Sequence, residues 1–201
     1  MIKLGADLPI HIAPVGIDTN DYPINKEPNP TLVFHIGAMD WLPNIEGIEW
    51  FFEKVWPIVK AKFPAAQLAL AGKKMPESIK AYQSNSIEVN DFVTDNIAFI
   101  GNGGIMIVPL FSGSGMRVKI VEGMAMQKAI VTTSIGAEGI AGVDGRDFLI
   151  GNTAEEFASN ILKLLEDPST KINGNSCKKI RSGSFRQFVY RKKTNQFFRF
   201  D

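Results

Sequence analysis

Residues 109–125 combine an apolar run, a glycine-rich turn and an expected helix. Gly113 and Gly115 would let the backbone approach a ligand closely, and the helix would present free N–H groups and the positive end of its dipole. A diphosphate is a natural occupant of that arrangement, and Arg117, expected in the first helical turn, would add a charge-assisted contact. The same glycines would also suit an ordinary strand-to-helix turn without a ligand.

Glu122 falls inside the same expected helix. One further turn returns its side chain to the face that bears Met116 or Val118. Its carboxylate could accept hydrogen bonds from ribose hydroxyls there, although an ordinary exposed helical glutamate has the same spacing.

Other catalytic patterns are weak or missing. His11 and His35 are far apart, and His35, inside an apolar run, is expected to be a satisfied core residue. No cysteine or histidine cluster has metal-ligand spacing, so no metal is expected. The glycines of residues 101–104 precede a strand instead of following one, and no Gly-Lys-Ser/Thr phosphate loop exists. NAD chemistry and ATP hydrolysis are therefore disfavoured, and no cofactor is expected.

Composition limits the partners and the compartment. The chain has 201 residues, is 45% hydrophobic and carries a formal net charge of +1, so no nucleic-acid partner is expected. The single Cys177 suits a reducing compartment. No apolar stretch reaches the roughly twenty residues of a membrane span. These features predict a cytoplasmic protein, with peripheral membrane association of a longer enzyme left open.

Strands and helices alternate along the centre of the chain. Short apolar runs predict strands at residues 32–36, 67–71, 87–93, 105–110, 129–133 and 148–150. Apolar residues at helical spacing predict helices at residues 43–64, 77–83, 116–126 and 154–165. We therefore expect an α/β fold, a Rossmann-like doubly wound parallel sheet of about six strands with helices on both faces. Its ligand crevice should lie beyond the carboxyl ends of the strands.

Three regions are expected. The five prolines of residues 1–30 indicate a connector, and residues 31–170 form the α/β domain. Residues 171–201 carry nine basic side chains against one acid, together with six aromatic residues. This last segment could be a solvated tail, but we expect it to pack on a domain that the chain lacks.

Several motifs resemble those of the retaining GT-B glycosyltransferases of group 1, the large group that contains sucrose and glycogen synthases. The run 112–125 followed by the strand 129–133 is similar to the group's donor-site motif, and residues 136–140 are similar to the loop that follows in bacterial members. Residues 37–44 resemble the first loop of members that make bacterial surface polysaccharides, and residues 15–19 resemble the interdomain linker. The resemblance covers about residues 14–167.

The resemblance implies a binding role for ten residues. It assigns the ribose to Glu122, the base to the neighbourhood of Phe92 and Val93, and the diphosphate to Gly37, Gly113, Gly115 and the amides of Met116 and Arg117. Ser114 stands where the group has the first glutamate of its motif, near the transferred sugar, so the catalytic residue is unknown. Met39 and Asn44 stand near the places of a basic pair, and Arg117 and Lys119 are expected to supply that charge instead.

The resemblance also implies the function. We expect the donor-binding half of a hexosyltransferase of polysaccharide or glycan biosynthesis, with a nucleotide-diphosphate sugar as substrate and an acceptor held by a missing N-terminal domain. The isolated chain should then be inactive in transfer. Two alternatives stay open, a non-catalytic nucleotide-sugar-binding module and half of a sugar-nucleotide epimerase.

Overall fold

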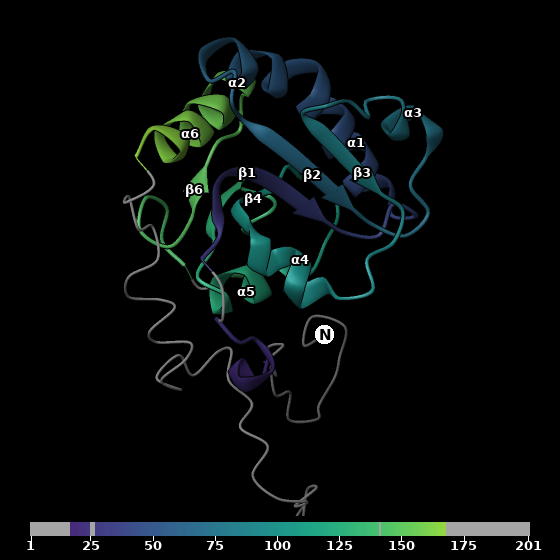
Figure 1. Ribbon diagram of the computed structural model, residues 1–201. Helices are drawn as coiled ribbons and strands as arrows, with labels where there is room; N and C mark the ends of the chain where they lie inside the picture. The colour runs from purple at the N-terminus through teal and green to yellow at the C-terminus, as the bar shows by residue number, and fades with distance from the viewer. Residues whose placement is uncertain (1–16, 25–26, 141, 168–201) are drawn as a thin grey trace, which may run out of the picture.

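The computed structural model describes residues 17–24, 27–140 and 142–167 (Figure 1). Their core is one six-stranded sheet in the order β3-β2-β1-β4-β5-β6, in which all paired strands run parallel. The strands are β1 (Asn29–Ile36), β2 (Gln67–Ala71), β3 (Ile87–Asn90), β4 (Gly103–Val108), β5 (Ala129–Thr132) and β6 (Leu149–Ile150). This is the doubly wound order of the Rossmann fold, so the predicted fold class is confirmed.

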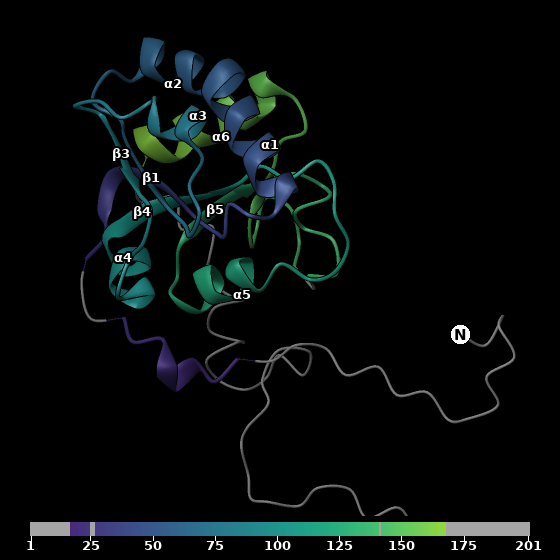
Figure 2. The same ribbon diagram turned by 90° about the vertical axis from the view of Figure 1, so that its right-hand side faces the viewer.

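The central strands are apolar on both sides because helices cover both faces of the sheet. In β1, Val33 and Phe34 are both fully buried and belong to different core clusters. One face is covered by α1 (Leu42–Trp50), a π-helical turn (Phe51–Val55), α2 (Trp56–Lys62), α3 (Glu77–Lys80) and α6 (Ala154–Glu166) (Figures 1 and 2). The other is covered by α4 (Asn96–Asn102) and α5 (Val118–Ala125).

Two helical predictions need correction, and one helix was not predicted. The helix expected at residues 43–64 is divided into α1, the π-helical turn and α2. Helix α4 was not predicted, because the glycines of residues 101–104 read as a turn, although the Asp95 side chain caps its first turn by accepting from the Ala98 N–H at 2.9 Å. Helix α5 begins at Val118, so Met116 lies outside it and Arg117 is its N-cap instead of a first-turn residue.

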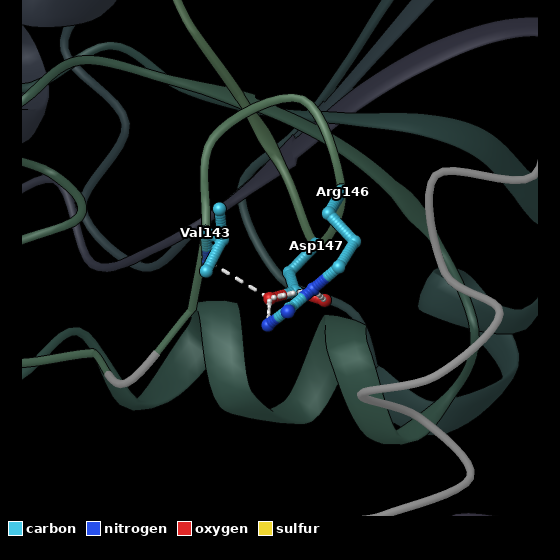
Figure 3. A network of polar contacts seen from close by, with 3 residues as sticks. All are labelled: Val143, Arg146 and Asp147. Carbon is cyan, nitrogen blue, oxygen red and sulfur yellow. Dashed lines mark hydrogen bonds and ion pairs between the residues drawn. The ribbon is translucent and has the colours of Figure 1, made fainter.

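The connection from β5 to β6 is a long loop held by a buried carboxylate. Asp147 accepts the Val143 N–H at 2.8 Å and pairs with the Arg146 guanidinium at 2.7 Å (Figure 3). The Arg146 side chain is half exposed, whereas Asp147 is fully buried. The pair compensates the buried charge and fixes the loop before the edge strand.

The strand order reverses between β1 and β4. Gly37 follows β1 and Pro109 follows β4, so their loops leave the same edge of the sheet. In open α/β sheets, ligands bind in the crevice at such a switch point. No helix among the described residues is long and apolar enough to span a membrane.

Candidate functional site

A cavity of about 490 Å³ lies at this edge of the sheet. Residues that follow β1, β2 and β3 meet two side chains of α5 there. Its lining consists of Ile36, Gly37, Ala38, Gly72, Lys73, Phe92, Val93, Thr94, Asn96, Ile100, Lys119 and Glu122. Apolar walls and a few convergent polar groups are typical of small-molecule sites. Another hollow, of about 510 Å³, is lined only by residues of α2, α6 and Asp167, and no strand end contributes to it.

Two glycines form the floor of the cavity because their loops touch. The Gly37 N–H donates to the Ala71 carbonyl at 2.9 Å, and a Cβ on Gly72 would lie 1.9 Å from the Gly37 oxygen. A Cβ on Gly37 itself would lie 2.3 Å from Lys119 Nζ. Any side chain at Gly37 would therefore displace this lysine from the floor.

The Lys119 ammonium links α5 to the first turn of α1. It donates to Asn44 Oδ1 at 3.0 Å, while Asn44 Nδ2 donates to the Ala38 carbonyl at 2.8 Å. Asn44 is buried, and both ends of its amide are engaged. Burial lowers the pKa of Lys119 to about 7, with repulsion from Arg117 as a second cause. The position where the resemblance expected a basic residue thus holds an amide that orients a lysine from elsewhere.

His35 lies beneath the same floor. Its ring is fully buried, and Nδ1 is 2.9 Å from the Ile107 carbonyl. Burial and the neighbouring Lys119 charge hold the pKa of His35 well below its usual value, so the ring is neutral and Nδ1 carries the proton that the carbonyl accepts. Within the described part of the chain Nε2 has no hydrogen-bond partner, so the expectation of a satisfied core histidine is met at one nitrogen only.

Arg117 turns back onto the glycine-rich loop. Its guanidinium donates to the carbonyls of Gly113, at 3.0 Å, and of Gly115. It also lies 5.4 Å from the Trp41 ring, and only 5% of the residue is exposed. Gly113 has φ +96°, and a Cβ there would meet the Trp41 ring at 2.6 Å. In this conformation Arg117 shapes the loop and does not line the cavity.

Glu122 lines the cavity and has a partner from far away in the sequence. The Tyr22 hydroxyl donates to Glu122 Oε1 at 2.8 Å. Burial and the adjacent carboxylate raise the pKa of Tyr22 well above its usual value, so the phenol stays a donor at neutral pH.

The structure brings together five of the ten predicted site residues, namely Gly37, Phe92, Val93, Lys119 and Glu122. The other five, Gly113, Ser114, Gly115, Met116 and Arg117, form the neighbouring loop and are not part of the cavity lining. Ser114 is exposed. No group of three or more His, Cys, Asp or Glu residues in the described ranges could hold a metal ion. Binding without a metal stays a prediction.

The ten predicted site residues do not include several lining residues and two supporting ones. Gly72, Lys73 and Thr94 lie in the segments after strands β2 and β3, where the crevice was expected from the positions of the strand ends. The contacts that Asn44 and Tyr22 make with the site had no such signal. These two residues lie 75 and 100 residues from the side chains they contact.

A known protein family matches the part of the chain that forms the sheet and its helices. The family model described as glycosyl transferases group 1 matches residues 30–167. A Klebsiella pneumoniae protein, described as an uncharacterized 44.6 kDa protein in the cps region, is 28% identical over 146 residues. That match covers 68% of this chain and 38% of the Klebsiella protein.

Solved structures show the same fold. TarM from S. aureus, in complex with fondaparinux, alpha-GlcNAc-glycerol and UDP, has a TM-score of 0.71 at 16% identity, covering 94% of this chain and 38% of TarM. The C-terminal domain of LpcC, a glycosyl transferase group 1 family protein from Francisella tularensis, has a TM-score of 0.66 at 18% identity, covering 84% of this chain and 98% of that domain. The chain thus spans under two fifths of the Klebsiella protein and of TarM, and nearly all of the LpcC domain.

Proposed function

Because the chain belongs to the glycosyl transferases group 1 family, we propose that its cavity binds the nucleotide-diphosphate sugar that serves as donor. The family resemblance predicted from the motifs is confirmed by the family match. The observation that carries the proposal is the meeting of Gly37, Phe92, Lys119 and Glu122 in one cavity at the switch point of the sheet. TarM was solved with UDP, which supports a nucleotide ligand.

Each part of the donor has a proposed contact. Glu122 accepts hydrogen bonds from the ribose hydroxyls, and the exposed ring of Phe92 lies beside the base with Val93. The diphosphate lies beside Gly37, which has no side chain of its own, and next to the Lys119 ammonium. The sugar then extends toward the loop of Gly113 and Gly115, which Arg117 holds in place.

Catalysis at such a site is positional and electrostatic. As the bond between the sugar and the diphosphate loosens, negative charge grows on the leaving group. The Lys119 ammonium and the N-terminal N–H groups of α5 face that charge in a partly desolvated place, where they stabilise it more than water does. No covalent role for a side chain of this chain is part of the proposal.

The finer assignment concerns the whole enzyme. We propose retaining transfer of a hexose in polysaccharide or glycan biosynthesis, and the cps-region relative supports this pathway class. The acceptor is proposed to bind a preceding domain, in keeping with the share of its relatives that this chain spans. The proposed compartment is the cytoplasm, with peripheral membrane contact of the full enzyme. The basic segment 171–201 lies outside the described residues.

A second candidate is a non-catalytic nucleotide-sugar-binding module. It is favoured by the exposed Ser114, which stands in place of the family's first motif glutamate. Both candidates bind the donor. Release of nucleoside diphosphate from the donor by the full-length enzyme with acceptor favours the transferase, and donor binding without any turnover favours the module.

Replacement of Glu122 by Gln tests the proposed site. The variant should lose about 1.5–3 kcal/mol of binding free energy for UDP or GDP, because hydrogen bonds to a charged acceptor are replaced, while inorganic pyrophosphate binds unchanged. Titration calorimetry in EDTA measures both ligands and also tests metal independence. Glu138→Gln, an exposed position outside the cavity, is the matched control. Equal weakening for nucleotide and pyrophosphate, or a strict requirement for Mg²⁺, contradicts the proposal.

A further inference from the structure

The contact between Tyr22 and Glu122 joins the segment before β1 to the cavity. The two residues are 100 positions apart, and the phenol donates to Oε1 at 2.8 Å. Glu122 lies on α5 and lines the cavity, whereas Tyr22 is not among its lining residues. Tyr22 therefore contacts the carboxylate without lining the cavity.

Local structure holds Tyr22 at that point. A short 3-10 turn, η2 (Thr19–Asp21), precedes it, closed by the Asp21 N–H donating to the Asp18 carbonyl at 3.1 Å. Before the turn, Ile17 is buried in the core cluster under α4 and α5, and Tyr22 itself packs against this cluster. The ring is thus anchored on the same helix layer that carries Glu122.

The chemistry of a carboxylate explains what this bond does. An ionised Glu side chain offers two oxygens and about four lone-pair sites, and it rotates freely on an exposed helix surface. A phenol bound to Oε1 fixes the rotamer and leaves Oε2 to accept hydroxyl groups from a ligand. A carboxylate is acceptor-only, which suits ribose hydroxyls as donors. The raised pKa of Tyr22 keeps the proton on the phenol, so Tyr22 remains a hydrogen-bond donor to Glu122 and does not repel the carboxylate as an anion.

We propose that Tyr22 is a positioning residue for nucleotide recognition, which orients the Glu122 carboxylate toward the ribose from the segment that precedes the domain. This inference rests on the proposed function, because it takes Glu122 as the ribose acceptor. It adds that the connector preceding the sheet takes part in donor specificity, so displacement of that connector weakens binding of the nucleoside and leaves the diphosphate contact intact.

The test is a Tyr22→Phe variant, which keeps the ring and its packing and removes only the hydroxyl. UDP binding should weaken about fivefold to tenfold, as expected for loss of an orienting hydrogen bond, while inorganic pyrophosphate binds as to the wild type. In a Glu122→Gln background, Tyr22→Phe should cause no further loss, because the oxygen that Tyr22 leaves free for the ribose has already been replaced by an amide nitrogen, which donates. Tyr82→Phe, whose ring stacks on Phe52 at a centroid distance of 4.0 Å, is the matched control and should bind UDP normally.

Each outcome has a distinct meaning. Wild-type chain that does not bind UDP or GDP overturns the proposed function and this inference with it. Normal UDP binding by Tyr22→Phe overturns this inference alone. Equal weakening for UDP and pyrophosphate, or an undiminished effect in the Glu122→Gln background, also overturns it, since either result indicates a general structural effect of the hydroxyl.

Discussion

At the scale of single residues, the site depends on side chains that hold one another in place. Lys119 is oriented by Asn44, and Glu122 is oriented by Tyr22. The charge of Lys119 is costly at this position, because burial and Arg117 both disfavour it and, within the described part of the chain, no carboxylate forms an ion pair with it. An arriving diphosphate supplies the missing negative charge.

This balance predicts that nucleotide binding is coupled to proton uptake. The pKa of Lys119 is about 7 in this structure, and an adjacent anion raises the pKa of an amine. Above pH 7 the amine is largely neutral before binding and protonated afterwards, so affinity for UDP should rise as the pH falls toward 7 and level off below it. At pH 8, calorimetry in buffers of different ionisation enthalpy should detect about one proton taken up per UDP bound.

Lys119→Arg is the control for this coupling, because a guanidinium stays charged throughout the range and should bind UDP without that uptake. Protons taken up by UDP itself are the same for both proteins, so they cancel when the proton uptake of the variant is subtracted from that of the wild type. Equal proton uptake by both proteins would assign the coupling to another group.

At the scale of elements, the site depends on close packing between α1 and the end of β4. A Cβ on Gly47 would lie 1.7 Å from the Pro109 carbonyl oxygen, so the helix backbone rests almost directly on the loop that leads to Gly113. The same helix begins next to Trp41, which contacts Gly113 and Arg117. The position of α1 therefore determines where the glycine-rich loop lies.

Gly47→Ala should destabilise the domain although alanine favours helices. The new methyl group collides with backbone, which cannot rotate away, and the free energy of unfolding should fall by about 1–3 kcal/mol. Gly101→Ala is the matched control in α4, where a Cβ meets only Met126 Cε at 3.7 Å and the change should be neutral or stabilising. Urea unfolding followed by circular dichroism measures both variants. A Gly47→Ala domain as stable as the wild type would mean that α1 is not held this closely.

The sequence predicted the presence of the strands better than the residues at which the helices begin and end. Apolar runs located all six strands, because central parallel strands are buried on both faces and carry a continuous signal, as Val33 and Phe34 do. The predicted start of α5 was too early, because Arg117 folds back onto the Gly113 and Gly115 carbonyls. Helix propensity does not reveal such a contact. The joint location of Gly37, Lys119 and Glu122 was predictable from strand ends and motif, whereas the pairing of Lys119 with Asn44 depends on how α5 and the first loop approach in three dimensions.

At the scale of the whole molecule, this domain presents a cavity at the carboxyl edge of its sheet. The chain spans 38% of the Klebsiella relative and of TarM, and 98% of an LpcC domain that was solved by itself. We expect a domain of this kind to bind donor with its own residues. Transfer additionally needs an acceptor placed against the sugar and water excluded from it.

We therefore predict that residues 1–201 alone bind donor and transfer no sugar. Incubation with UDP- or GDP-sugars and oligosaccharide acceptors, followed by mass spectrometry, should show slow donor hydrolysis at most. Fusion to the preceding domain of a full-length relative should restore transfer, and the fusion carrying Glu122→Gln is its control. Efficient transfer by the isolated chain would contradict the proposed division of labour.

The central claim is that the nucleotide occupies the cavity at the carboxyl edge of β1, β2 and β3 beside α5, and a crystal structure of this chain grown with UDP or GDP tests it most directly. We predict that the ribose hydroxyls lie within hydrogen-bond distance of Glu122 and that the base lies beside Phe92. A phosphate oxygen should accept a hydrogen bond from Lys119 Nζ next to Gly37. Nucleotide bound in the hollow between α2 and α6, or in the cavity with its ribose away from Glu122, would contradict it.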